Sequence, residues 1–371
     1  MRAIAIVDGE HYPEVVRAAL DELPYEFVAV RLVGGTEKLR GVPDYGLPIV
    51  DEGTGGADIA VDLSDEPVLG PKRRFELASE ILAAGIPYVG ADFRFDPPTF
   101  HPFAPPSIAV IGTGKRVGKT AVTAHVARLL ARERSVVVVA MGRGGPAEPE
   151  LVQTPPTLDE LVDRSRSGRH AASDHLETAV VAEVPTIGCR RAGGGLAGAP
   201  FTSNVLEGAR LAESLDPDIV VFDGSGAAIP PIDVGARILV AHDLDSGLNP
   251  YRARISDVVL RVGEDFSLRL RPLEQLAGRV AVFTAGAADT AHLDADVVHV
   301  SRNLARRDLL SDELSGIEAD TYLVELKAAA VDVVVEHALE QGARVVFAAD
   351  DVVAEGLDER ILALVREEVL A

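Results

Sequence analysis

Short apolar runs alternate with amphipathic stretches along the first ninety residues. The runs of strand length are AIAIVD, EFVAVRLVGG, ADIAVDLS and PYVGAD, and the stretches between them include PEVVRAALDEL and KRRFELASEILAAG. Strands that alternate with helices are typical of a parallel sheet covered on both faces. No Gly-x-Gly-x-x-Gly follows the first run, so the pattern predicts a Rossmann-like domain over residues 1–92 without the dinucleotide fingerprint.

The alternation stops at a proline-rich segment and then starts again. Prolines rule out a central strand or a helix interior, so residues 93–106 are expected to be a linker. From Ser107 the chain reads as strand, glycine-rich loop and helix, which predicts a P-loop NTPase domain with a mainly parallel sheet over residues 107–245. Further strand-like runs predict a C-terminal α/β region over residues 246–371, so the fold class is α/β throughout.

Charge and cysteine content narrow the class of ligand and the compartment. A net charge of −22 opposes binding to nucleic acid or to an acidic membrane surface, so an anionic ligand must be met by clustered cations. The single cysteine, Cys189, excludes an internal disulfide and fits a reducing cytosol. The N-terminal apolar run, residues 3–7, ends at Asp8 and is too short for a signal peptide or membrane span. We expect a cytoplasmic protein, and homo-oligomerisation is left open.

The segment GTGKRVGKT, residues 112–120, has the features of a phosphate cradle. Backbone N–H groups at a helix N-terminus, glycines that permit close approach and a lysine for the β and γ phosphates all follow an apolar strand. The alternative, a turn that merely caps the helix, does not require the lysine. The predicted nucleotide-binding residues are Gly112, Thr113, Gly114, Gly118, Lys119, Thr120 and Ala121.

A second element is expected to hold Mg²⁺. Asp223 ends the apolar run DIVVF and precedes Gly224-Ser225-Gly226, about a hundred residues after the loop. A carboxylate there can bind Mg²⁺ together with the hydroxyl of Thr120. Taken alone, Asp223 would be interpreted as an ordinary residue that caps a turn. Because a phosphate loop precedes it in the chain, a metal-binding role is favoured.

Several cations fall at predicted strand ends or inside the loop. Lys115 and Arg116 lie between the loop glycines and, with Lys119, are the predicted catalytic cations. The predicted substrate ligands, for a small polyanion, are Arg143, Arg190, Arg191, Gly193, Gly194 and, in the first domain, His11. The alternatives are a flexible hinge with solvated arginines and, for His11, a turn at a domain interface. Glu325 and Lys327 are expected to form only a helix cap and a surface charge.

The loop resembles that of dethiobiotin synthetase and its P-loop relatives, in which a threonine at the second position is normal. The usual place of a second loop lysine corresponds to Gly114, so Lys115 is an approximate counterpart. The whole chain resembles the cyclic 2,3-diphosphoglycerate synthetase family, through AIVDGEHYPEVV, GTGKRVGKTAV, GRGGPAEPEL, GCRRAGGGLAGAPFTSN, DIVVFDGSG and ELKAAAVDVV. That resemblance implies an ATP- and Mg²⁺-dependent ligase that closes a phosphoanhydride within 2,3-diphosphoglycerate and releases ADP and phosphate. Archaeal members are longer, so the substrate stays open at this point.

Two other functions remain. One is a ligase or kinase like dethiobiotin synthetase, which acts on another anionic small molecule. The other is a nucleotide-dependent switch protein; the chain lacks the Asn-Lys-x-Asp guanine motif, which disfavours GTP.

Overall fold

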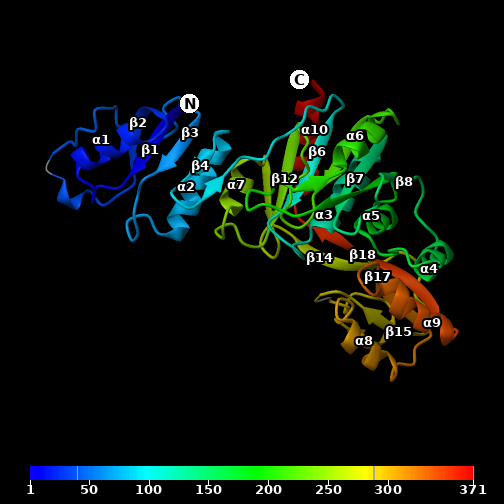
Figure 1. Ribbon diagram of the computed structural model, residues 1–371. Helices are drawn as coiled ribbons and strands as arrows, with labels where there is room; N and C mark the ends of the chain where they lie inside the picture. Colours follow the sequence, from blue (N-terminus) through cyan, green and yellow to red (C-terminus); the bar gives the residue numbers. More distant parts are fainter. Residues whose placement is uncertain (40, 287–288, 371) are drawn as a thin grey trace. The chain divides into compact units, whose positions relative to one another are not determined.

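The first ninety-five residues form a five-stranded sheet of order β2-β1-β3-β4-β5 (Figure 1). The computed structural model describes residues 1–39, 41–286 and 289–370. All neighbouring strands in this sheet are parallel except β4 and β5. The strands are β1 (Arg2–Val7), β2 (Glu26–Leu32), β3 (Ile59–Asp62), β4 (Tyr88–Val89) and β5 (Arg94–Phe95), and the helices are α1 (Pro13–Glu22), α2 (Pro71–Ala83) and the short 3₁₀ turn η1 (Thr36–Lys38).

A second sheet contains the predicted phosphate loop. Its order is β10-β9-β7-β11-β6-β12-β13, with β8 paired to β9, and only β8 and β10 run antiparallel to their neighbour. The strands are β6 (Ser107–Gly112), β7 (Val136–Gly142), β8 (Glu150–Val152), β9 (Thr186–Ala192), β10 (Thr202–Ser203), β11 (Ile219–Asp223), β12 (Ala236–Ala241) and β13 (Val258–Arg261). The accompanying helices are α3 (Lys119–Leu130), α4 (Leu158–Arg166), α5 (Asp174–Ala182) and α6 (Val205–Glu213). Every residue of β6, β7 and β11 is buried, which explains why the sequences of these strands are almost continuously apolar.

A third sheet follows in the chain, of order β14-β18-β17-β15-β16, in which only β14 is antiparallel. Its strands are β14 (Ser267–Pro272), β15 (Arg279–Phe283), β16 (Asp296–Ser301), β17 (Thr321–Glu325) and β18 (Arg344–Val353). The helical segments are α8 (Arg307–Leu314), the π-helix η2 (Ala330–Val335), α9 (Glu336–Glu340) and the last helix α10 (Leu357–Leu370). The α/β class with mainly parallel sheets is therefore confirmed.

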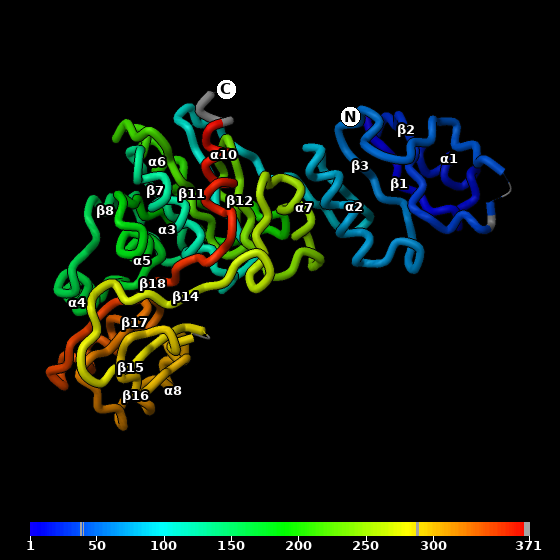
Figure 2. Tube along the Cα trace, turned by 180° about the vertical axis from the view of Figure 1, so that it is seen from behind, coloured from blue at the N-terminus to red at the C-terminus, as the bar shows by residue number. Residues whose placement is uncertain are grey.

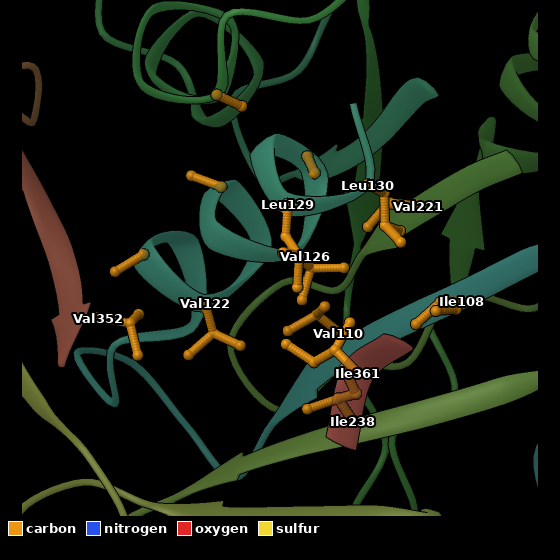
Figure 3. Close-up of a cluster of buried hydrophobic side chains, with 14 of the residues drawn as sticks. Ile108, Val110, Val122, Val126, Leu129, Leu130, Val221, Ile238, Val352 and Ile361 are labelled. Atoms are coloured by element: carbon orange, nitrogen blue, oxygen red, sulfur yellow. The ribbon is translucent and has the colours of Figure 1, made fainter. Parts of the chain in front are cut away.

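The C-terminal elements help to complete the core of the second sheet. Val352 of β18 and Ile361 of α10 lie in one buried cluster with Val122 and Val126 of α3 and with strand residues such as Val110 (Figure 3). Helix α10 runs beside α3 and β12 (Figure 2). The side chains of Ile361 and Val110 are fully buried, so this packing ties the end of the chain to the helix that follows the phosphate loop.

Two predicted boundaries differ from the observed sheets. The P-loop region was predicted to end at residue 245, but β13 pairs in parallel with β12 and so extends the second sheet. The predicted linker begins at residue 93, but β5 pairs with β4, because Phe93 and Phe95 stack on each other and Phe93 packs on Tyr88.

The described chain forms two compact units. One unit contains residues 1–99, 195–199 and 243–256, and in it α7 (Asn249–Arg254) packs on α2. The other described residues form the second unit.

Candidate active site

The phosphate loop joins the end of β6 to the start of α3. Gly118 adopts φ 87° immediately before the helix, a conformation that favours glycine. A β-carbon at Gly112 would lie 3.0 Å from the carbonyl oxygen of Gly226, so a larger residue would push the loop off the neighbouring turn. Val117 is buried in the hydrophobic cluster, with its Cγ2 3.4 Å from where a β-carbon on Gly112 would be, and so anchors the loop to the core. Thr120 and Ala121 follow Lys119 in the first turn of the helix.

Thr113 stands where a stricter loop pattern would place glycine, and the structure gives it a role. Its backbone N–H donates to the carbonyl oxygen of Val240 at 3.1 Å, and its Oγ1 accepts from the N–H of His242 at 3.3 Å. The threonine therefore closes the loop onto the end of β12. A β-carbon at Gly114, by contrast, would face open space, so no neighbouring atom requires a glycine at this position.

Lys119 and Asp223 form an ion pair at the centre of the loop. The Lys119 Nζ contacts Asp223 Oδ1, which also accepts from Thr123 Oγ1 at 2.9 Å. Burial raises the pKa of Asp223, while Lys119 and Thr123 act in the opposite direction. The carboxylate is almost completely buried, so its charge in this state depends on the lysine.

Asp174 is a residue that the sequence analysis missed. It is the first residue of α5, and its exposed carboxylate lies beside the last residue of β7, with Oδ2 3.0 Å from where a β-carbon on Gly142 would be. Its charge acts to raise the pKa of Asp223. Because β8 and α4 lie between the end of β7 and Asp174, no local motif connects Asp174 to the phosphate loop.

Three cations surround Gly226, and we call Lys115, Arg143 and Arg191 the cation cluster. A β-carbon at Gly226 would lie 3.1 Å from Arg143 Nη2, 3.8 Å from Arg191 Nη2 and 4.0 Å from Lys115 Cγ. Gly226 has φ 60°, so both the backbone and the available space favour glycine here. Residues far apart in the sequence thus present positive charge next to the loop.

Arg191 is the most strongly held member of the cation cluster. Its Nη1 donates to the carbonyl oxygen of Gly193 at 2.5 Å and its Nη2 to that of Ser225 at 2.8 Å. Burial lowers the pKa of Arg191, and the nearby charge of Arg143 lowers it further. Its Nε is buried and has no hydrogen-bond partner among the described residues. Two cations that repel each other, one with an unused buried donor, are suited to an anionic ligand.

The other predicted cations and glycines are placed differently. Successive side chains of a strand point to opposite faces, so Arg190 leaves β9 on the face opposite to Arg191, and its backbone N–H donates to Asn204 Oδ1 at 2.6 Å. Arg116 is exposed and adopts φ 60°, and among the described residues it makes no hydrogen bond or ion pair with the cation cluster. Gly193 has φ 71° and abuts Phe201, and Gly194 borders the guanidinium of Arg191.

Lys327 lies in a cluster of carboxylates and is not the surface charge that was predicted. Its Nζ is 3.5 Å from Glu177 Oε1, 3.8 Å from Asp350 Oδ2 and 4.0 Å from Glu325 Oε2. Glu325 ends β17 and accepts from the N–H of Ala285, so it caps no helix. These four residues line a small cavity together with Thr120 and Ala121. The third sheet therefore reaches the first turn of α3 through Lys327.

Glu177 should make the stability of the protein pH-dependent. Burial raises its pKa from 4.5 to about 7, against the lowering effect of Lys327. A raised carboxyl pKa means that its stabilising contribution is complete below pH 4.5 and is lost as the pH rises through about 7. The wild-type protein should therefore lose up to about 3 kcal/mol of unfolding free energy between pH 5 and pH 8 through this group. In Glu177→Gln this loss should be absent, so the melting temperature should fall less over the same pH range. The exposed Glu183→Gln at the end of α5 is the control, and identical pH profiles for wild type and Glu177→Gln would contradict the assignment.

His11 belongs to the N-terminal unit, at the end of β1. Its Nδ1 is 2.9 Å from Oδ1 of the fully buried Asp8, and its Nε2 is 3.5 Å from Asp65 Oδ2. Burial acts to raise the pKa of Asp8, but hydrogen bonds from the Asp65 N–H and from His11 outweigh it and lower that pKa. Asp8 therefore stays charged and orients the His11 ring, at the sheet edge where open α/β sheets bind ligands.

Comparison with known proteins bears on all three sheets. Models for three domains of cyclic 2,3-diphosphoglycerate synthetase match the chain: the N-terminal domain at residues 2–96, the P-loop domain at residues 107–280 and the C-terminal domain at residues 272–351. A relative of that name from Rubrobacter xylanophilus is 44% identical, over 99% of this chain and 97% of its own. The chain belongs to the cyclic 2,3-diphosphoglycerate synthetase family. It is therefore an enzyme, of the synthetase type, and its P-loop domain supports the use of a nucleotide.

Other members of the family match at similar coverage. The relative from Thermococcus gammatolerans is 41% identical, over 93% of this chain and 92% of its own, and that from Methanothermobacter thermautotrophicus is 36% identical, over 99% and 96%. A crystal structure of LpxK from Aquifex aeolicus in complex with ATP has a TM-score of 0.45 and 15% identity, over 73% of this chain and 90% of LpxK. Among the described helices, none combines the length and the apolar character that a membrane crossing requires.

Proposed function

We propose that this enzyme uses ATP to close an intramolecular phosphoanhydride in 2,3-diphosphoglycerate, giving the cyclic compound, ADP and inorganic phosphate. The substrate carries two phosphates and a carboxylate, and ATP adds a triphosphate, so many negative charges must meet in one place. Two unit charges of the same sign at 4 Å repel by about 4 kcal/mol at an effective dielectric of 20. The cation cluster beside the phosphate loop, with the unused Nε of Arg191, is the observation that carries this proposal.

The proposed reaction proceeds in two displacements. An oxygen of one substrate phosphate attacks the γ phosphorus of ATP, the bond to the β–γ bridging oxygen breaks, and ADP leaves. An oxygen of the other substrate phosphate then attacks the phosphorus of the first, forms the ring anhydride and releases inorganic phosphate. No side-chain nucleophile is required, because a phosphate oxygen is the attacking atom in both steps.

The residues of the loop and of the cation cluster have distinct parts in this proposal. Lys119 would leave Asp223 and neutralise the β and γ phosphates, within the cradle formed by residues 112–121. Arg143, Arg191 and Lys115 would hold the second phosphate compound, with Arg116 and Arg190 as outer cations and Gly193 and Gly194 as backbone donors. Within the N-terminal unit, His11, oriented by Asp8, is proposed as a ligand of the phosphate substrate.

Mg²⁺ fits the oxygen donors of this site. Thr120 and Asp223 would hold it, and Asp174 is near enough to Asp223 to influence its pKa. The described residues contain no group of three or more His, Cys, Asp or Glu side chains that could hold a metal ion by themselves. Mg²⁺ commonly binds through one or two protein ligands, and phosphate and water complete its coordination shell. When bound, the ion would neutralise charge on the phosphates.

Substrate-dependent release of ADP tests the proposal. With purified protein, ATP and Mg²⁺, ADP should form when 2,3-diphosphoglycerate is added and hardly at all without it. A kinase or ligase like dethiobiotin synthetase would respond to another anion, and a switch protein would respond only to a protein partner. The single cysteine supports a cytoplasmic location as part of this proposal.

A further inference from the structure

A second cavity lies away from the phosphate loop, between the α4–α5 connection and the π-helix. Its volume is about 260 Å³, which suits a small metabolite rather than a few isolated waters. Ala171 and Val331 form buried apolar parts of the wall, and Arg169, His170, Arg307 and Asp332 supply polar groups. No step of the proposed reaction uses this cavity.

The charge of the cavity is opposite to that of the protein. Arg169 and Arg307 contribute two cations, and Asp332 contributes one carboxylate. The chain as a whole carries −22 charges, so a hollow with more cations than carboxylates stands out as a place where an anion is favoured. Arg307 is held by Asp332 through Nη2, which fixes its guanidinium at the cavity while leaving its other donors for a ligand.

The backbone at the cavity has features that ordinary packing does not require. Ala328 adopts φ 42°, in the left-handed region that residues with a β-carbon avoid. Val331 and Asp332 lie in the π-helix η2, a conformation that is rare in proteins and frequent at functional sites. Both features fall in the segment ELKAAAVDVV, to which the proposed reaction assigns no role.

Two segments at the cavity also touch the active site. The His170 ring lies against Gly144, since a β-carbon at Gly144 would be 3.6 Å from His170 Cδ2, and Gly144 follows Arg143 of the cation cluster. Lys327, next to Ala328, lines the small cavity at Thr120. A molecule bound between these segments would therefore contact neighbours of both the phosphate loop and the cation cluster.

We propose that this cavity is a second anion-binding site, which takes a small molecule with a phosphate group. Free phosphate and a phosphorylated three-carbon acid share the chemistry that Arg169 and Arg307 would recognise. The inference does not depend on the proposed reaction, because it concerns binding at residues outside the phosphate loop and the cation cluster.

Calorimetric titration of the full chain tests the site. The titrations use an Arg191→Gln background, which weakens binding at the cation cluster, with inorganic phosphate and 3-phosphoglycerate as separate probes. Arg307→Gln in that background should weaken binding by about tenfold, the loss expected for a charge-assisted hydrogen bond. Arg306→Gln is the matched control, because it removes the same charge one residue away from an exposed position outside the cavity. Asp332→Asn should tighten binding, because it removes a negative charge from the cavity while its amide oxygen can still accept from Arg307.

The outcomes separate the possible ligands and the failure of the idea. Binding of both probes with the same variant pattern identifies a phosphate site; binding of 3-phosphoglycerate alone identifies a site for the phosphorylated acid. The proposal is overturned if neither probe binds in the Arg191→Gln background, if Arg306→Gln weakens binding as much as Arg307→Gln, or if Asp332→Asn weakens it. Arg307 and Asp332 form a partly exposed ion pair, so unchanged melting temperatures are expected and serve as the check on folding.

Discussion

Replacing Lys119 with alanine is expected to lower substrate-dependent ADP release by about 10³-fold, because the β and γ phosphates lose the cation that the loop presents to them. The measurement is the rate of ADP formation with saturating 2,3-diphosphoglycerate. Arg132→Ala is the control, since it removes an exposed cation just beyond α3 whose contact with Asp358 is 3.8 Å long. Turnover at the wild-type rate in Lys119→Ala would contradict the placement of the ATP site.

The same lysine also stabilises the folded state, and the two effects can be separated. Lys119→Ala leaves the buried Asp223 without its cation, which is expected to destabilise the protein by up to about 3–5 kcal/mol. The double variant Lys119→Ala/Asp223→Asn removes both charges, so its melting temperature should recover while its turnover stays low. Recovery of turnover in the double variant would show that the single substitution acted only through stability.

Arg191→Gln is the second substitution with a large expected effect. It removes the guanidinium that bonds to Gly193 and Ser225 and offers an unused Nε beside Arg143. The loss of one or two charge-assisted hydrogen bonds should lower kcat/KM for 2,3-diphosphoglycerate by roughly 10- to 100-fold. The affinity for an ATP analogue, measured by titration, should change much less, because the loop residues 112–121 are untouched.

Arg190→Gln is the matched control for that experiment. It makes the same chemical change one residue earlier, on the opposite face of β9. Because Arg190 is only an outer cation in the proposed site, kcat/KM should fall much less in Arg190→Gln than in Arg191→Gln. An equal loss in Arg190→Gln and Arg191→Gln would mean that the two arginines act through general charge, and that the cation cluster is wrongly assigned.

The fold and the family could be predicted from the sequence because the informative signals are local. An apolar strand, Gly118-Lys119-Thr120 and a following helix lie within a few turns of chain, so β6, the loop and α3 follow from periodicity and spacing. Asp223 could be singled out because it ends an apolar strand before glycines. The roles of individual site residues stay predictions until the variants are measured.

What the sequence did not reveal depends on long-range packing. Strand alternation distinguishes Arg191 from Arg190, but only once the register of β9 and the position of Ser225 are known. The carboxylates around Lys327 come from α5, β17 and β18, and no spacing along the chain indicates that these meet near Thr120. Likewise, β13 extends the second sheet and Ile361 enters its core although both lie beyond the predicted boundary at residue 245.

Phosphorus NMR of the complete reaction tests the central proposal most directly. The enzyme, ATP, Mg²⁺ and 2,3-diphosphoglycerate are combined, and the phosphorus spectrum is followed as ADP forms. We expect the two phosphomonoester signals of the substrate to be replaced by two mutually coupled anhydride signals, in step with ADP and inorganic phosphate. ADP formation with the substrate signals unchanged, or with the γ-phosphoryl group retained on a linear product, would contradict ring closure by this enzyme.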